Sequence, residues 1–401
     1  MTGTAAGVLA RAAALGEISE EPGRLTRRFA TPAMTRAADL VTGWMENAGL
    51  AVRRDAVGNV IGRTQGDGPP FVVGSHLDTV PNAGRYDGPL GILSALAVVE
   101  RLAAGGVRPS VPLEVVAFAD EEGTRFGTSY LGSAAYSGGF KREWLGLVDA
   151  DGITLAEAIL AAGGDPEAAV GSSAPQLAGY LEVHIEQGPV LERDGIPVGV
   201  VTAIAGQSRV RVVMRGEAGH AGTVPMAARR DALAAAAEVV LAVEHVGRST
   251  DGLVATVGAM ELSPNVGNVV PGEARMLLDV RHAADPVRAR AVDTIRADVE
   301  RIASARGVDA SWTLRYDTAA VELAPGLRRR LEGAIEAGGH PLRTLVSGAG
   351  HDAVVLSRLC PTAMVFVRCA GGVSHDPRES VEEADVGVAL DVVERFLRGL
   401  A

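Results

Sequence analysis

The sequence predicts an α/β protein in which a smaller α+β domain is inserted into a larger domain that has a mostly parallel sheet. The chain has 401 residues, a length that favours two domains over one. Apolar runs at residues 71–73 and 111–119 end in polar clusters and are followed by helical patterns, which is typical of buried parallel strands. Near residue 205 the pattern changes to alternating strands and long helices, and beyond residue 320 the earlier pattern returns.

The larger domain takes its elements from both ends of the chain. Amphipathic periodicity predicts its helices, and apolar runs or strict alternation predict its strands. The expected helices cover residues 8–16, 35–48, 92–102, 128–135, 155–162, 327–338 and 381–400, and the expected strands cover 51–54, 59–63, 71–73, 111–119, 180–185 and 362–367. We therefore assign residues 1–205 and 318–401 to one discontinuous domain.

The inserted domain covers residues 206–317 and shows the order β-α-β-β-α-β. Its expected strands are 208–215, 253–262, 274–281 and 312–316, and its expected helices are 226–245 and 286–306. This order fits a two-layer, ferredoxin-like unit.

The composition excludes several functional classes. The net charge of −11 argues against a nucleic-acid partner, because phosphate binding requires a basic face. The longest apolar segment is interrupted by Glu238 and Glu244, and the N-terminus does not resemble a signal peptide, so we expect a cytoplasmic protein with no membrane span. Cys360 and Cys369 lack the paired spacing of a zinc site, and we expect both to be buried strand residues.

Metal-binding side chains lie where a predicted strand gives way to a helix. His76, Asp78 and Asp87 follow the apolar run at 71–73 and precede the helix at 92–102, with turn-forming residues between them. Loops of this kind, at the carboxyl ends of strands, hold the ligands of open α/β sheets. Imidazole and carboxylate groups side by side there indicate a divalent metal site.

Other candidate ligands follow other strands. Glu121 and Glu122 follow the strand at 111–119; as neighbours leaving a strand, they are expected to point to opposite sides and to have different roles. His184 lies near the end of its strand, and His375 lies in a glycine-rich loop after the strand at 362–367. Two metal ions that share one bridging carboxylate, roughly 3.5–4 Å apart, would use five ligands. These are His76, Asp87, Glu122, His184 and His375, a mixed set that favours zinc, with manganese, cobalt or nickel as substitutes.

At this point the sequence resembles a known family. The Gly-Ser-His-Leu-Asp sequence at 74–78, Asp-Gly at 87–88, Asp-Glu-Glu-Gly at 120–123 and Ser-His at 374–375 resemble the di-zinc aminoacylases and carboxypeptidases. Further motifs resemble one branch of that clan, the N-carbamoyl-L-amino acid hydrolases, β-ureidopropionases and allantoate amidohydrolases. They are found at 182–192, 206–207, 219–222, 225–226, 268–271, 279–281 and 347–352. His184 is the diagnostic residue, since related peptidases usually carry an acidic residue there.

The resemblance implies roles for the metal-site residues. His76 and His184 would hold one metal ion and Glu122 and His375 the other, with Asp87 bridging the two. Asp78 would orient His76 from behind. Glu121 would be the general base that takes a proton from the attacking water and returns it to the leaving nitrogen.

The resemblance also implies the residues that contact the substrate. His220, in the inserted domain, would donate to the oxyanion. Arg281 would bind the substrate carboxylate with its guanidinium fork. Gln187 and Asn268 would hydrogen-bond the ureido or carboxylate group, and Gly350 and His351 would line the pocket. The inserted domain mediates homodimers in relatives, so His220 is expected to reach the partner's site; whether Asn268 does so is left open.

The implied activity is hydrolysis of the linear ureido C–N bond of an N-carbamoyl-L-amino acid or an allantoate-like substrate. The products would be ammonia with carbon dioxide, or a ureido acid. Two alternatives stay open. An aminoacylase or dipeptidase would share the metal ions and the base, and a non-catalytic metal-binding relative would share the fold. The second is disfavoured because neither a ligand nor the base is missing.

Overall fold

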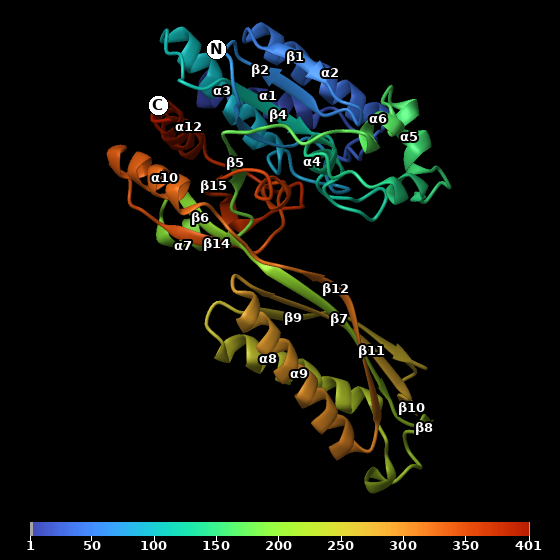
Figure 1. Cartoon of the computed structure of the whole chain (residues 1–401). Coiled ribbons are helices and arrows are strands. Elements are labelled where there is room, and N and C mark those ends of the chain that lie inside the picture. Colours follow the sequence, from blue (N-terminus) through green and yellow to red (C-terminus); the bar gives the residue numbers. More distant parts are fainter. Residues whose placement is uncertain (1–2, 401) are drawn as a thin grey trace. The chain divides into compact units, whose positions relative to one another are not determined.

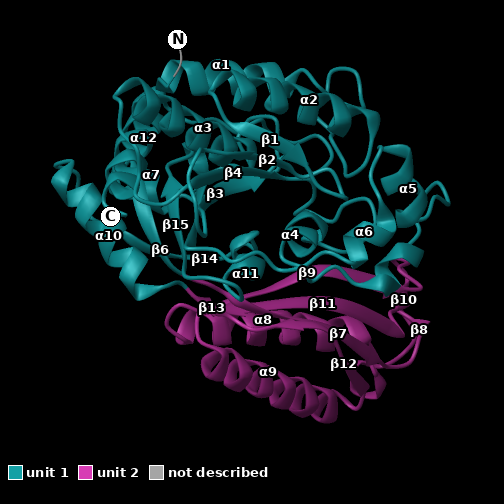
Figure 2. Ribbon diagram, turned by 45° about the horizontal axis from the view of Figure 1, so that its top comes forward, with its two compact units in different colours: residues 1–202, 323–401 teal, residues 203–322 magenta. Residues whose placement is uncertain are grey.

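The computed structural model describes residues 3–400, and the chain forms two compact units. The first unit comprises residues 1–202 with 323–401, and the second comprises residues 203–322 (Figure 2). The expected insertion, residues 206–317, falls inside the second unit. Among the described residues, no helix is long and apolar enough to cross a membrane.

A nine-stranded mixed sheet forms the centre of the first unit and also includes β13, whose residues 321–322 fall in the range of the second unit (Figure 1). Its strands are β1 (Ala51–Arg54), β2 (Val60–Arg63), β3 (Phe71–His76), β4 (Leu113–Phe118), β5 (Gly179–Ile185), β6 (Val198–Ile204), β13 (Val321–Glu322), β14 (Thr344–Ser347) and β15 (Thr362–Val367). The order is β1-β2-β4-β3-β5-β15-β6-β13, with β14 paired to β6. The neighbours β4, β3, β5 and β15 run parallel, so their carboxyl ends meet at one edge.

The four parallel strands are buried along their whole length, which explains their continuous apolar runs. The helices of this unit include α1 (Ala5–Gly16), α2 (Pro32–Asn47), α3 (Pro89–Ala104), α10 (Pro325–Ala337) and α12 (Glu383–Arg398). Helix α3 packs on β3, β4 and β5, and α1 and α12 pack against α3. Side chains from these helices and strands form one hydrophobic core, which holds the central strands rigidly in place.

Short helices and turns complete the first unit. They are α4 (Leu131–Tyr136), η1 (Arg142–Gly146), α5 (Leu155–Ala161), α6 (Pro166–Val170), α7 (Val190–Asp194), α11 (Ala353–Leu356) and η3 (Ala370–Gly372). Cys360 and Cys369 are buried as predicted, but the prediction that they lie in a strand is wrong. Cys360 precedes β15 and Cys369 follows it, because the apolar run that forms the strand covers only 362–367.

The second unit has its own antiparallel sheet, in the order β12-β7-β11-β9. Its elements are β7 (Gly206–Arg215), β8 (Gly219–His220), η2 (Met226–Ala228), α8 (Ala232–Ser249), β9 (Val254–Ser263), β10 (Val269–Val270), β11 (Glu273–His282), α9 (Asp285–Arg306) and β12 (Asp309–Thr318). Alternate residues of β7 and β11 pack under α8 and α9 in a second core. The main elements follow the predicted β-α-β-β-α-β order.

One helix of the second unit begins later than predicted. The expected helix at 226–245 is divided into a short 3₁₀ turn and α8, which begins at Ala232. Asp231 caps α8, and its side chain accepts hydrogen bonds from the N–H groups of Leu233 and Ala234. A capping aspartate has non-helical backbone angles, so the helix cannot extend back through it.

Candidate metal centre

Four neighbouring parallel strands bring the predicted ligands to one edge of the first sheet. His76 is the last residue of β3, His184 is the last but one of β5, and Glu122 follows the end of β4. Asp87 lies in the loop between β3 and α3, and His375 lies in the loop after β15. The predicted ligands therefore come together from four parts of the chain, with His76 and Asp87 from the same strand and its loop.

Asp87 lies between two pairs of ligands. Its Oδ1 atom is 3.4 Å from Nε2 of His76 and 3.1 Å from Nε2 of His184. Its Oδ2 atom is 3.2 Å from Nε2 of His375, which is itself 3.3 Å from Oε1 of Glu122. Within each of two groups, His76 with Asp87 and His184, and Asp87 with Glu122 and His375, the ligand atoms lie within 4.8 Å of one another. The arrangement suits cations on both sides of one carboxylate.

Hydrogen bonds behind the first pair of histidines direct their Nε2 atoms to the centre. Nδ1 of His76 lies 3.1 Å from the carbonyl oxygen of Asp78 and 3.3 Å from its Oδ1. Nδ1 of His184 lies 3.0 Å from the carbonyl oxygen of Ile185. A proton on each Nδ1 leaves a lone pair on Nε2, the form that binds metals. Nε2 of His184 is buried and makes no hydrogen bond, so these residues fit a metal ion.

Asp78 connects the loop of His76 to the turn after β4. Its two carboxylate oxygens accept hydrogen bonds from the N–H groups of Glu121 (2.9 Å) and Glu122 (3.2 Å). The side chain is fully buried, so it is in contact with protein groups on all sides. Its contacts agree with a role in orienting His76 and the two glutamates together.

The two glutamates do not diverge as the strand geometry suggested. Strand β4 ends at Phe118, and Glu121 and Glu122 both lie in the turn that follows. One oxygen from each carboxylate lies within 4.8 Å of the other and of a ring nitrogen of His76. Burial raises the pKa of Glu121 well above its usual value, against the lowering effect of His76. A carboxylate with such a pKa is suited to carry a proton.

Gln187 and Ser374 contact the shared carboxylate. The amide Nε2 of Gln187 donates to Oδ2 of Asp87 (2.9 Å) and to Oγ of Ser374 (3.1 Å). The hydroxyl of Ser374 donates to the same Oδ2 at 2.7 Å. Sequence reasoning assigned Gln187 to the substrate and gave Ser374 no role, although Ser374 belongs to the Ser-His motif.

Gly350 and His351 lie behind the ligands. The ring of His351 is buried, with its centroid 4.6 Å from that of His184, and its Nε2 lies 2.8 Å from Oγ of Ser347. Burial lowers the pKa of His351 well below its usual value, so the ring is neutral. A Cβ atom on Gly350 would lie 3.8 Å from Oε1 of Glu121, which places this backbone beside the expected base.

The remaining predicted residues belong to the second unit. His220 on β8 pairs with Val269 on β10, and the N–H of Ala221 donates to the carbonyl of Asn268, so His220 and Asn268 lie together. Nδ1 of His220 accepts a hydrogen bond from the N–H of Gly222 at 3.0 Å, which places the ring proton on Nε2.

Arg281 lies on β11, in a different sheet from His220. Its Nε and Nη2 atoms contact the two carboxylate oxygens of Asp279 at 2.7 and 2.9 Å. Asp279 also accepts from Gln207 and Arg209. This bidentate pair holds the guanidinium plane in one orientation.

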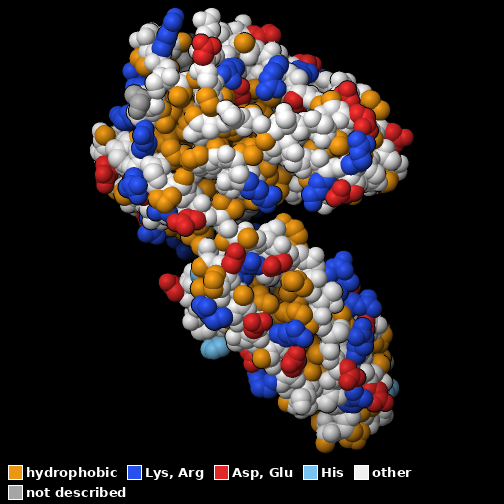
Figure 3. Space-filling model, viewed as in Figure 1, with side chains coloured by type: hydrophobic (Ala, Val, Ile, Leu, Met, Phe, Trp, Pro, Cys, Tyr) orange, Lys and Arg blue, Asp and Glu red, His pale blue; other side chains and the backbone are white. Residues whose placement is uncertain are grey.

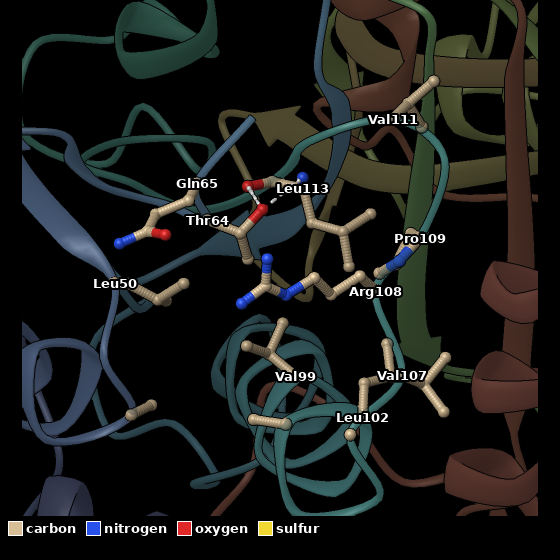
Figure 4. A pocket seen from close by; sticks show the side chains of 13 residues that line it. Leu50, Thr64, Gln65, Val99, Leu102, Val107, Arg108, Pro109, Val111 and Leu113 are labelled. Atoms are coloured by element: carbon tan, nitrogen blue, oxygen red, sulfur yellow. Dashed lines mark hydrogen bonds between the residues drawn. The ribbon is translucent and has the colours of Figure 1, made fainter. Parts of the chain in front are cut away.

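A separate pocket lies at the opposite ends of the same elements. It has a volume of about 420 Å³, beside the amino end of β4 and the C-terminal end of α3. Leu50, Val99, Leu102 and Leu113 line it with apolar surface, and Arg108 extends across it (Figure 4). Its lining contains no histidine, cysteine or carboxylate, so this pocket does not offer metal ligands.

Comparison with known proteins identifies the family. The model of peptidase family M20/M25/M40 matches residues 72–399. The chain belongs to this family. The metal dependence of M20/M25/M40 proteins agrees with the histidine and carboxylate clusters at the sheet edge.

Within the M20/M25/M40 family, the chain is similar over nearly its whole length to amidohydrolases that act on ureido compounds or are named for them. It is 42% identical to N-carbamoyl-L-amino acid amidohydrolase of Geobacillus stearothermophilus, over 94% of both chains. It is 38% identical to allantoate deiminase 1 of Glycine max, over 98% of this chain and 89% of the relative. A hydantoinase/carbamoylase family amidase from Burkholderia multivorans superposes with a TM-score of 0.94 at 34% identity, over 100% of this chain and 98% of that chain. The predicted resemblance and the α/β fold class are confirmed.

Proposed function

We propose that this protein is a metal-dependent amidohydrolase that cleaves the linear ureido C–N bond of an N-carbamoyl-L-amino acid or an allantoate-like acid. The observation that carries the proposal is the position of Asp87, whose two oxygens face different pairs of ligands. Proteins named for these two activities are similar to the chain over nearly its whole length. A structural neighbour, AtUAH, has been crystallised in complex with (S)-hydroxyglycine; it is 32% identical and its TM-score is 0.80.

In this proposal the centre holds two divalent ions, with zinc the first choice and manganese, cobalt or nickel as substitutes. His76 and His184 hold one ion, Glu122 and His375 hold the other, and Asp87 is shared. The ions would polarise the carbonyl oxygen of the substrate and make the attacking water more acidic.

Glu121 is the proposed general base. It accepts a proton from the attacking water, which adds to the carbamoyl carbon, and it returns the proton to the leaving nitrogen. Its buried environment supports its role as a base, since a carboxylate with a raised pKa has a higher affinity for the proton of the attacking water. For a carbamoyl substrate the products are ammonia, carbon dioxide and the amino acid.

Residues of the second unit are proposed to bind the substrate and to stabilise the transition state. The Nε2–H of His220 would donate to the oxyanion, a role supported by the hydrogen bond that fixes the proton on this nitrogen. Arg281 would bind the substrate carboxylate, with Asp279 holding the guanidinium in place. Asn268 and Gln187 would contribute further hydrogen bonds to the substrate.

A homodimer is proposed to form through the second unit, with His220 acting in the partner's site. Strand β9 is an edge strand, since it pairs with β11 alone in the described sheet. Leu241 on α8 and Met260 on β9 are exposed, and hydrophobic side chains are visible on the face of this unit drawn in Figure 3. Exposed apolar residues beside an open strand edge favour association of two copies.

The test is a substrate panel. Ammonia release would be measured with allantoate, N-carbamoyl-L- and D-amino acids and N-carbamoyl-β-alanine, with added zinc or manganese, and with a chelator. Amine release would be measured with an N-acetyl amino acid and a dipeptide. Ammonia from one ureido substrate, abolished by the chelator, supports the proposal. Turnover of the acetylated compound or the dipeptide alone would instead indicate an aminoacylase or dipeptidase.

A further inference from the structure

We infer that Glu379, to which sequence reasoning gave no role, is a positioning residue for Asp87 and for the part of the centre formed by Glu122 and His375. Its Oε1 atom accepts hydrogen bonds from the N–H groups of Tyr86 (2.7 Å) and Asp87 (3.1 Å). The inference deepens the proposed function, because it concerns the same metal centre.

The surroundings of Glu379 indicate that the two hydrogen bonds from backbone N–H groups are the main contribution of its carboxylate. The residue is 4% exposed, and its second oxygen, Oε2, is buried without a hydrogen-bond partner. Burial of an unpaired carboxylate costs stability, and an apolar side chain would fill the same space without that cost. The retained benefit is two hydrogen bonds from adjacent backbone amides.

Two backbone contacts fix the orientation of Asp87. Bonds to successive N–H groups restrict both the peptide plane that precedes Asp87 and the direction of its side chain. The sequence leaves space for this contact at Gly84, where a Cβ atom would lie 2.4 Å from Glu379. Any larger residue at position 84 would displace the glutamate.

The same loop carries both Glu379 and His375. The N–H of Glu379 donates to the carbonyl of Asp376 at 3.0 Å, which closes a turn directly after His375. This loop therefore contacts the Asp87 loop through three residues, the side chains of Ser374, His375 and Glu379. The separation between Oδ2 of Asp87 and Nε2 of His375 is set by the protein before a metal ion binds.

The other part of the centre has different supports. His76 and His184 lie on strands β3 and β5 of the core, and their Nδ1 atoms are held by Asp78 and Ile185. Loss of the Glu379 carboxylate would therefore weaken the site formed by Asp87, Glu122 and His375 more than the site formed by His76 and His184.

The experiment is a zinc titration of metal-free protein by calorimetry. We expect Glu379→Ala to bind its first equivalent like the wild type and its second at least about tenfold more weakly, as when an outer partner of a ligand is lost. Glu379→Gln retains an acceptor oxygen, so we expect it to bind the second equivalent of zinc almost as tightly as the wild type does. Glu383→Ala, an exposed position nearby, is the matched control and should bind like the wild type.

A second readout needs no metal. Hydrogen exchange of the segment 84–88 should accelerate in metal-free Glu379→Ala and stay unchanged in Glu383→Ala. Equal affinities in Glu379→Ala and wild type, equal weakening of both equivalents, or a wild type that binds one equivalent would overturn the inference. A wild type that binds two ions and cleaves no ureido compound would overturn only the proposed function.

Discussion

Asp87 is the residue on which the candidate centre depends most directly. It is 4% exposed, and three imidazoles and the side chains of Gln187 and Ser374 surround its two oxygens. Burial alone would raise its pKa, but the neighbouring imidazoles of His184, His375 and His76 lower the pKa well below its usual value. Asp87 is therefore ionised, as a shared metal ligand must be.

Glu121 gives the sharpest test of the chemistry. Replacement by glutamine removes the proton acceptor and keeps the shape of the side chain, so we expect kcat to fall by about 10²–10⁴-fold. Metal content, measured by mass spectrometry, should stay at the wild-type level. The neighbouring Glu122→Gln is the comparison, because loss of a ligand should reduce metal content as well as rate. Glu121→Gln protein with wild-type kcat would exclude this residue as the base.

The reactivity of the two cysteines tests whether the ends of β15 are buried in the native protein. Cys360 and Cys369 are free thiols that are 7% and 0% exposed, and burial raises the pKa of each to about 11. Only the thiolate is nucleophilic, so we expect almost no alkylation by iodoacetamide at pH 7.5 in the native protein. Mass spectrometry after denaturation in the same reagent should show both sites modified. Rapid labelling of native protein would show that the strand ends open.

The residues that could be found from the sequence are direct ligands of fixed chemical type, whereas the residue that was missed acts through backbone contacts between distant loops. His76, Glu122, His184 and His375 are recognisable because metal ligands must be particular residue types at strand ends. Glu379 acts on Asp87 through backbone amides 292 positions away, and any carboxylate in a loop looks the same in the sequence. Such a partner becomes visible only when the fold brings the two loops together.

The parallel strands β4, β3, β5 and β15 are the elements that build the site. Their continuous apolar runs made them predictable, as did the long helices of the second unit. The strands β6, β13 and β14 were not expected, because two to seven residues that pair mainly antiparallel leave little periodic signal. The exact start of α8 was missed for a local reason, the capping by Asp231.

Gly88 joins the Asp87 loop to α3, and its backbone conformation leads to a prediction about stability and zinc affinity. Gly88 has φ of +82°, and a Cβ atom there would lie 2.5 Å from the carbonyl oxygen of His76. Gly88→Ala should therefore move the loop that carries Asp87, at a cost of about 1–3 kcal/mol in unfolding free energy. Zinc affinity should fall as well. Chemical denaturation and zinc titration would measure both effects, with Gly43→Ala, where a Cβ atom meets no neighbour within 4 Å, as the control.

At the level of the whole molecule, the proposed function assigns roles to residues of both units. The metal ligands and Glu121 belong to the first unit, whereas His220, Asn268 and Arg281 belong to the second. The second unit has its own hydrophobic core and its own sheet, so its residues are placed as a group. If two copies associate through β9, one active site takes its base and its oxyanion donor from different chains. A heterodimer of two chains that each carry one inactivating substitution tests this assembly.

Complementation between two inactive variants decides which chain supplies His220. Co-expression of differently tagged Glu121→Gln and His220→Ala chains allows their heterodimer to be purified. If His220 acts across the dimer, one of its two sites combines an intact base with an intact donor, and activity should return to about half that of the wild type. If His220 acts within its own chain, each site carries one defect, and the heterodimer should be no more active than the two variants alone. The two homodimers, assayed at the same metal loading, are the controls. A monomer in light scattering that retains full activity would contradict the dimeric arrangement itself.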